Sequence, residues 1–257
     1  TRILNRWLPP ATLAIWGTIL LYFWGSGRLA SFLHPNFRPG VMIAGAVLLL
    51  LALGAAIGGE AVCCDEESSC SHTLGRFTWG KLVSFATLLL PLLFAFAGTK
   101  DGFGMAAIQN RGVITEASGL ALPPEALPDL ETFMPKNAEG VVKISVMDLL
   151  YAAQEPGFRQ ELSGKPVEVV GQLMEETEAN PFGNRMKLVR MYMNCCAADA
   201  RPVGALIELP RPTDLPTLSW VKVNGTLHFP MEGGKPLSVL KVQRMEPVDP
   251  PEETMLY

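Results

Sequence analysis

Three uncharged apolar runs near the start of the chain limit what it can fold into. They cover about residues 8–24, 41–57 and 82–98, and each is near the shortest helix, roughly 17 residues, that crosses about 30 Å of hydrocarbon. Trp7, Tyr22, Trp24 and Trp79 lie at their ends, where amphipathic rings prefer a membrane interface. Buried core helices are the alternative, but three in succession would need a core that the remaining sequence does not supply. We therefore predict an anchor of three transmembrane helices within residues 1–100, in contact with the lipid bilayer.

The charge balance changes after this anchor. Residues 1–99 hold six Lys/Arg and four Asp/Glu, whereas residues 100–257 hold 15 Lys/Arg and 21 Asp/Glu, a net charge of −6. An acidic domain is a poor partner for nucleic acid, because neutralising phosphates requires clustered Lys and Arg. Residues 101–140 are rich in Pro and Gly without clear periodicity, so we predict a tether there. A soluble domain over residues 141–250 and a tail over 251–257 complete the expected organisation.

The soluble domain begins with helical periodicity and continues with strand periodicity. Ser145 and Asp148 have the spacing of a capping box, which predicts a short helix to about Gln154. Gly171 and Gly225 interrupt strand patterns and indicate bulges or corners. Five β-rich runs favour a small OB-like β-barrel, with a β-sandwich as the alternative. The predicted strands are Val167–Leu173, Met186–Met193, Ala205–Leu209, Trp220–Phe229 and Leu237–Val242.

Two adjacent cysteines in this domain are the leading candidates for chemistry. Cys195 and Cys196 follow a strand pattern, and Asp199 comes three residues later. On a regular strand neighbouring side chains face opposite sides, so joint binding of Zn²⁺ or Cu(I) requires a turn or bulge at this point. The alternatives are a strained vicinal disulfide, or a structural turn in which Asp199 accepts backbone N–H groups. His228, the one histidine of the domain, is a further ligand candidate or an ordinary strand residue.

A second cysteine group lies between the second and third apolar runs. Cys63, Cys64, Cys70 and His72 occur within ten residues together with three carboxylates. Thiolates and imidazole are ligands for Zn²⁺ and Cu(I), but the spacing is not that of a zinc finger. Palmitoylated cysteines or an acidic linker remain alternatives. This loop is therefore a weaker metal-site hypothesis than the vicinal pair.

The order of these elements resembles a known family. An N-terminal hydrophobic pair around His34-Pro35, a further span, a tether and the run from Arg190 to Gly204, with its Cys-Cys-x-Ala-Asp-Ala-x-Pro stretch, are similar to the YcgQ-like two-component membrane permease subunits. The resemblance covers most of the chain. It implies an accessory role beside a separate multi-span permease, in metal-ion transport. Some members have a His-rich second loop, from which Cys63, Cys64, Cys70 and His72 depart.

Two function classes follow from these observations. The first is a non-enzymatic permease subunit that binds or hands over a metal ion. The second is a membrane-tethered thiol-disulfide oxidoreductase, which the absence of a Cys-x-x-Cys motif disfavours. The sequence also lacks a phosphate-binding Gly-Lys-Ser/Thr loop and a Gly-x-Ser-x-Gly nucleophile elbow. We expect a multi-pass protein of the cell (plasma) membrane, its soluble domain outside the cytoplasm, although loop Lys and Arg are balanced across the predicted spans.

Overall fold

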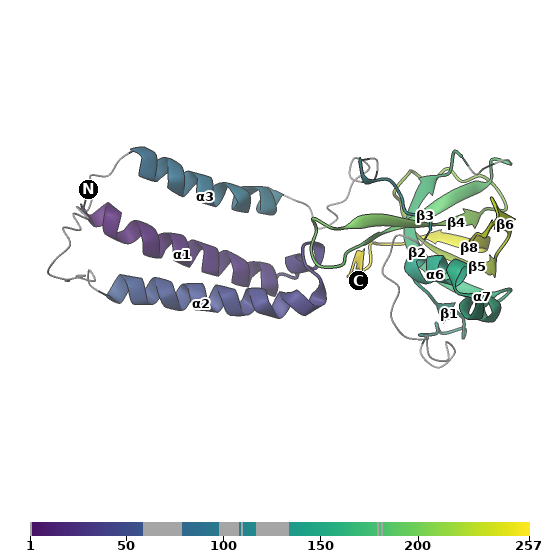
Figure 1. Cartoon of the computed structure of the whole chain (residues 1–257), viewed down its shortest axis with the longest axis horizontal. Coiled ribbons are helices and arrows are strands. Elements are labelled where there is room, and N and C mark those ends of the chain that lie inside the picture. The colour runs from purple at the N-terminus through teal and green to yellow at the C-terminus, as the bar shows by residue number, and fades with distance from the viewer. Residues whose placement is uncertain are drawn as a thin grey trace. The chain divides into compact units, whose positions relative to one another are not determined.

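The chain folds into two compact units, Thr1–Gly102 and Phe103–Tyr257. The structure, a computed structural model, describes residues 2–58, 79–97, 108, 110–116, 134–178, 180 and 182–257. Helices make up the described part of the first unit, and the described part of the second holds a mixed sheet with the short helices α6 (Val146–Gln154) and α7 (Pro156–Leu162) beside it (Figure 1).

The described residues of the first unit form three α-helices. They are α1 (Arg2–Gly25), α2 (Arg38–Ile57) and α3 (Trp79–Ala97), and two short 3-10 helices, η1 (Arg28–Ser31) and η2 (Pro35–Phe37), connect the first two. The backbones of α1 and α2 approach closely at Gly17 and Gly45, because a Cβ added to Gly17 would lie 2.8 Å from the carbonyl oxygen of Gly45. Small residues permit this kind of packing where helix association does not depend on water.

The prediction of three spans is not supported. Among the described residues, two helical stretches are long and apolar enough to cross a membrane: Trp7–Gly25, and Pro35–Ile57, which begins in η2 and includes α2. Within the described side chains of α3, the continuous apolar stretch is Val83–Phe94, which does not reach that length.

The second unit is built around a seven-stranded sheet, in the order β1-β2-β5-β8-β4-β3-β9. The expected helix is confirmed as α6, whose N-terminus carries the full capping box between Ser145 and Asp148. All five predicted strands are present, with bounds that differ by a few residues. The elements are β1 (Val142–Lys143), α6 (Val146–Gln154), α7 (Pro156–Leu162), β2 (Pro166–Glu175), β3 (Arg185–Tyr192), β4 (Arg201–Glu208), β5 (Trp220–His228), β6 (Met231–Glu232), β7 (Lys235–Pro236), β8 (Val239–Pro247) and β9 (Met255–Leu256).

The strand pairings form a ring. Besides the order above, β2 pairs with β3, so the series β2–β5–β8–β4–β3 returns to β2. All of these pairings are antiparallel except that of β4 with β8, which is parallel. The alternating buried side chains of β5 and the apolar face of α6 enter one core, which includes Leu149, Leu188 and Leu227. A water-free core of this kind is the main stabilising contribution in a domain of this size.

Two glycines mark the places where strands come unusually close. The register of β5 against β8 shifts between Asn224 and Gly225, which confirms the predicted bulge. A Cβ on Gly225 would lie 2.3 Å from the carbonyl oxygen of Lys241. Gly171 lies beside the point where β2 changes partner from β5 to β3, and a Cβ there would meet Leu188 at 2.7 Å. Side chains are excluded at both positions because a neighbouring strand or core side chain occupies the space.

The sheet also includes residues expected to lie outside the domain. Ile114, within the predicted tether, forms a parallel bridge with Val203. Met255 and Leu256, within the predicted tail, form β9 alongside β3. The guanidinium of Arg190 donates to the carbonyl oxygens of Glu253 and Thr254 and so holds this terminal segment. Neither segment has an amphipathic pattern long enough to reveal this pairing in the sequence.

Candidate metal centre

The vicinal cysteines lie in the loop that joins β3 to β4. This loop, residues 193–200, turns back on itself, and the N–H of Asp199 donates to the carbonyl of Cys196 at 3.0 Å. The Asp199 carboxylate accepts the backbone N–H groups of Asn194 at 3.1 Å and Cys195 at 2.8 Å. The structural role considered for Asp199 is therefore present. A carboxylate that closes a turn in this way also fixes the direction of the neighbouring side chains.

This turn brings the two sulfur atoms to the same side. The Sγ atoms of Cys195 and Cys196 are 3.7 Å apart, and both cysteines are free thiols. One oxygen of Asp199 and the two sulfurs all lie within 4.8 Å of one another. Among the described residues, Cys195, Cys196 and Asp199 are the group of Cys, His, Asp or Glu side chains whose ligand atoms lie close enough together to hold one metal ion. The requirement that the strand become irregular is met because β3 ends at Tyr192.

The carboxylate and the thiol affect one another's protonation. A hydrogen bond to Asp199, together with one to Cys196, raises the pKa of the Cys195 thiol to about 11. Burial alone would raise the pKa of Asp199, but hydrogen bonds from the thiol and N–H of Cys195 and from the N–H of Asn194 hold it below its ordinary value. The thiol is therefore protonated at neutral pH. This disfavours Cys195 as the attacking group in disulfide exchange, because the attacking species is the thiolate.

The loop rests on a small methionine-rich cluster. Met193 and Ala200 are fully buried at its two ends and pack with Met191 and Met255. The N–H of Met193 donates to the carbonyl of Leu256 in the terminal segment. The guanidinium of Arg111 donates to the carbonyls of Ala197 and Ala200. Both ends of the loop are thus held by the sheet, while Cys195 is exposed to solvent.

The other predicted ligands do not join this group. Cys63, Cys64, Cys70 and His72 lie outside the described residues. His228 lies at the end of β5, a strand that pairs with β2 and β8 rather than with β3. It lines a cavity that also includes Arg185, the first residue of β3. Since a strand rises about 3.3 Å per residue, His228 and the cysteines are near opposite ends of β3.

Sequence reasoning did not identify the charged groups at that opposite end. Arg185 donates to both carboxylate oxygens of Glu232 at 2.7 and 3.0 Å, and to Glu208 at 3.1 Å. These partners are 23 and 47 residues away in the sequence, so no local motif connects them. Bidentate pairing of this kind gives geometric specificity. Here it fastens the β6–β7 hairpin to β3.

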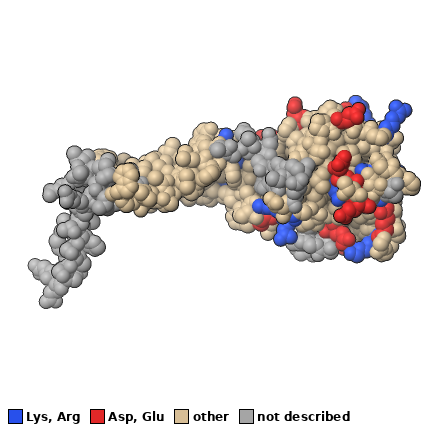
Figure 2. All heavy atoms as spheres, turned by 90° about the horizontal axis from the view of Figure 1, so that it is seen from above, with Lys and Arg blue, Asp and Glu red and all other residues tan. Residues whose placement is uncertain are grey.

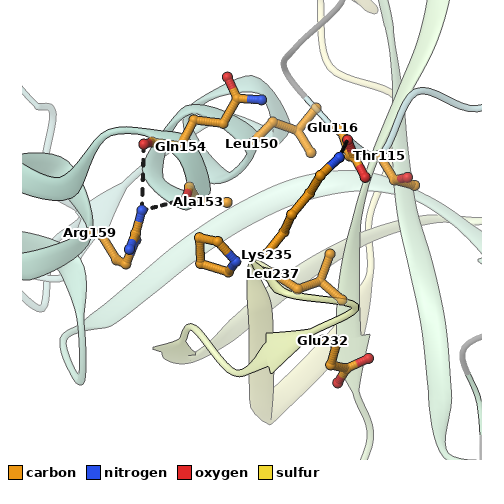
Figure 3. Close-up of a pocket in the computed structure, with 10 residues that line it drawn as sticks. Thr115, Glu116, Leu150, Ala153, Gln154, Arg159, Glu232, Lys235 and Leu237 are labelled. Carbon is orange, nitrogen blue, oxygen red and sulfur yellow. Dashed lines mark hydrogen bonds and ion pairs between the residues drawn. The ribbon is translucent and has the colours of Figure 1, made fainter.

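A cavity of about 260 Å³ lies between α6 and the β6–β7 hairpin (Figure 3). Arg159 donates to the carbonyls of Ala153 and Gln154 at the C-terminal end of α6, and Lys235 pairs with Glu116 at 2.8 Å. Its charged groups therefore already bind other parts of the domain. The arrangement indicates a structural junction more than a ligand site.

Comparison with known families adds an assignment. Residues 10–113 match the DUF1980 N-terminal domain, and residues 143–257 match the DUF1980 C-terminal domain. The chain contains both domains of the DUF1980 family. No curated protein matches the chain. The match to DUF1980 does not indicate an activity. It also does not establish that the chain is a YcgQ-like permease subunit.

Each of the two cysteine groups lies within one of the matched DUF1980 domains. The loop with Cys195, Cys196 and Asp199 falls within the C-terminal DUF1980 domain, whereas Cys63, Cys64, Cys70 and His72 fall within the N-terminal one. The C-terminal match extends to Tyr257 and so includes β9. The terminal strand that supports the cysteine loop is therefore part of the DUF1980 domain.

Proposed function

We propose that this DUF1980 protein is a non-enzymatic, membrane-anchored subunit that binds a soft metal ion and hands it to a multi-span permease. The observation that carries the proposal is the convergence of Cys195, Cys196 and Asp199, whose ligand atoms lie within 4.8 Å on a loop with an exposed thiol. Zn²⁺ and Cu(I) are the ions for which such sulfur ligands are suited.

The exposure of the site supports exchange more than permanent storage. Structural zinc sites are closed by four protein ligands, whereas sites that exchange a ligand keep one position open. Among the described residues the loop offers three ligands, with Cys195 exposed. An ion held there remains accessible to an incoming ligand from a partner.

The helical unit supports a location at the membrane. In the proposal α1 and α2 anchor the chain as a multi-pass protein of the cell (plasma) membrane, with the sheet unit outside the cytoplasm. The large apolar side chains exposed on α2, among them Ile43, Leu50 and Leu53, support contact with lipid or with another helix. On the face shown in Figure 2, charged side chains gather on the sheet unit, while the described helices are nearly free of them. The permease partner itself rests on the family resemblance.

The sheet unit further supports an OB-like barrel. In this proposal the five strands β2, β3, β4, β5 and β8 form the closed wall, which the ring of pairings favours. The cysteine loop then connects the second and third strands of the barrel. Loops that connect barrel strands are common binding positions because a rigid wall holds their ends.

Metal binding by the full chain in detergent, with reduced thiols, tests the proposal. We expect the Cys195→Ser/Cys196→Ser variant to lose tight binding of Zn²⁺ and Cu(I) at this site, since a neutral hydroxyl is a far poorer ligand than a thiolate. The matched control is Cys63→Ser/Cys64→Ser/Cys70→Ser, which removes three thiols but leaves the loop of residues 193–200 unchanged. The decisive comparison is between the triple variant and the same protein with Cys195→Ser/Cys196→Ser added. Equal metal binding by these two proteins would refute the proposal.

A further inference from the structure

We propose that the cysteine loop is built for a tetrahedral divalent ion of the zinc class, rather than for linear two-coordinate Cu(I). This inference rests on the proposed function, because it concerns the same three side chains. It adds the identity of the ion that the loop selects and the way in which it is coordinated.

The separation of the two sulfur atoms is the first observation. Their 3.7 Å distance, with metal–sulfur bonds of about 2.3 Å, gives a sulfur–metal–sulfur angle of about 107°. This is close to the tetrahedral value. A linear ion between the same thiolates would require the sulfurs to be about 4.6 Å apart, twice the bond length. The loop therefore presents its thiols at the spacing of a tetrahedral edge.

The chemistry of the third group is an independent observation. Asp199 adds a carboxylate oxygen to the cluster. Zinc accepts Asp oxygen beside Cys sulfur, whereas Cu(I) is selected by thiolate and thioether ligands. Two thiolates and one carboxylate carry three negative charges, of which a divalent ion neutralises two. The ligand set therefore favours a borderline divalent ion over a soft monovalent one.

The backbone of the loop is held on both sides of the cysteine pair. Asp199 holds the N–H groups of Asn194 and Cys195, and Arg111 holds the carbonyls at Ala197 and Ala200. Met193 and Ala200 are fully buried beneath. At the observed spacing the two sulfurs and the Asp199 oxygen all lie within 4.8 Å of one another. The tetrahedral arrangement is therefore the one that uses all three side chains.

The full chain in detergent, carrying Cys63→Ser/Cys64→Ser/Cys70→Ser so that one cysteine pair remains, allows a direct test. Co²⁺ serves as the spectroscopic probe, and Zn²⁺ and buffered Cu(I) are titrated separately under anaerobic, reducing conditions. We expect one Co²⁺ per chain with the intense visible bands of tetrahedral coordination and a thiolate charge-transfer band. Zn²⁺ should displace it.

Asp199→Asn distinguishes the two ions. We expect this variant to weaken Zn²⁺ binding about 10-fold or more, in line with the cost of disturbing metal-site ligation, and to change Cu(I) binding by less than about threefold. The matched control is Asp214→Asn, which removes an exposed carboxylate elsewhere in the same unit. Far-UV circular dichroism of both variants checks that the fold is retained.

The outcomes separate the two proposals. A weak, octahedral Co²⁺ spectrum, or Zn²⁺ binding that does not depend on Asp199, would overturn the tetrahedral inference. If Cys195→Ser/Cys196→Ser still abolishes Cu(I) binding in that case, the proposed function stands without it. Binding of both ions that is unaffected by Cys195→Ser/Cys196→Ser would overturn both proposals.

Discussion

The two units of this chain differ in how far their large apolar side chains are exposed. In the sheet unit Leu227 is 0% exposed and packs in a single core, whereas in the helical unit Leu50 is 68% exposed. Helix α1 approaches α2 through Gly17 and Gly45 rather than through large side chains. Exclusion of water thus stabilises the sheet unit, while the helical unit leaves large apolar side chains such as Leu50 outside its own packing. The same residue type has a different role in each unit.

Truncating a leucine in each unit is the strongest test of this difference. We expect Leu227→Ala to destabilise the sheet by about 2–5 kcal/mol, because it leaves a cavity in a core without solvent. Leu50→Ala should leave the stability of both units within about 0.5 kcal/mol, as exposed substitutions usually do. Hydrogen exchange of the full chain in detergent reports both units at once. Equal losses of protection would mean that the units do not differ in this respect.

Adding one methyl group to a glycine in each unit should give the next largest effect. Gly225→Ala places a Cβ 2.3 Å from the carbonyl oxygen of Lys241, so we expect a loss of about 1–3 kcal/mol from overpacking. Gly54 in α2 has open space where a Cβ would lie, and Gly54→Ala should be neutral or stabilising by up to about 1 kcal/mol. Thermal unfolding measured by circular dichroism distinguishes them. A neutral Gly225→Ala would show that the bulge can relax.

A buried and a half-buried arginine provide a third comparison. Arg190 is 8% exposed, its guanidinium lies over the Trp220 ring, and burial lowers its pKa to about 10. Arg190→Met leaves buried carbonyls of the terminal segment without their donor, and we expect a loss of about 1–3 kcal/mol with faster hydrogen exchange in β9.

The control is Arg28→Met in the helical unit. The Arg28 side chain donates to the carbonyl of Phe96 across an exposed contact of 3.3 Å, so its loss should be small. If Arg190→Met leaves exchange of residues 253–257 unchanged, the terminal strand does not depend on this side chain.

The smallest predicted effect concerns acid sensitivity of the sheet unit. The hydrogen bond from Arg185 lowers the pKa of Glu232 below its ordinary value of 4.5. A lowered folded-state pKa stabilises the protein above about pH 4.5, and this stabilisation is lost as the pH falls through the lower value. Because the Glu232 side chain is 36% exposed, solvent screening limits the effect to about 0–1 kcal/mol.

We therefore expect Glu232→Gln to reduce stability slightly at pH 7 and to flatten the loss of stability below pH 4.5. Urea unfolding at several pH values measures both. If Glu232→Gln loses stability below pH 4.5 as steeply as the unchanged protein, another group causes the acid sensitivity, for example the Lys222–Glu246 pair.

Local patterns predicted much of the fold. The capping box identified the start of α6, alternation located β2 and β5, and Gly225 marked the bulge, since each depends on neighbouring residues. The third span was not supported, because the apolar stretch within the described side chains of α3 is shorter than the other two. The cysteine pair and Asp199 were identified together from their spacing. The supporting Arg111, Met255 and Leu256 were missed because they are distant in sequence.

The sequence alone determined that this chain has an apolar helical part, an acidic strand-rich part and a Cys-Cys-x-Ala-Asp motif, because composition, periodicity and short spacings are local properties. The tertiary structure decided which strands pair, that residues 255–256 join β3, and that both thiols face the same side, 3.7 Å apart. These features depend on contacts between distant residues and on the irregular turn that Asp199 closes, so a one-dimensional pattern does not contain them.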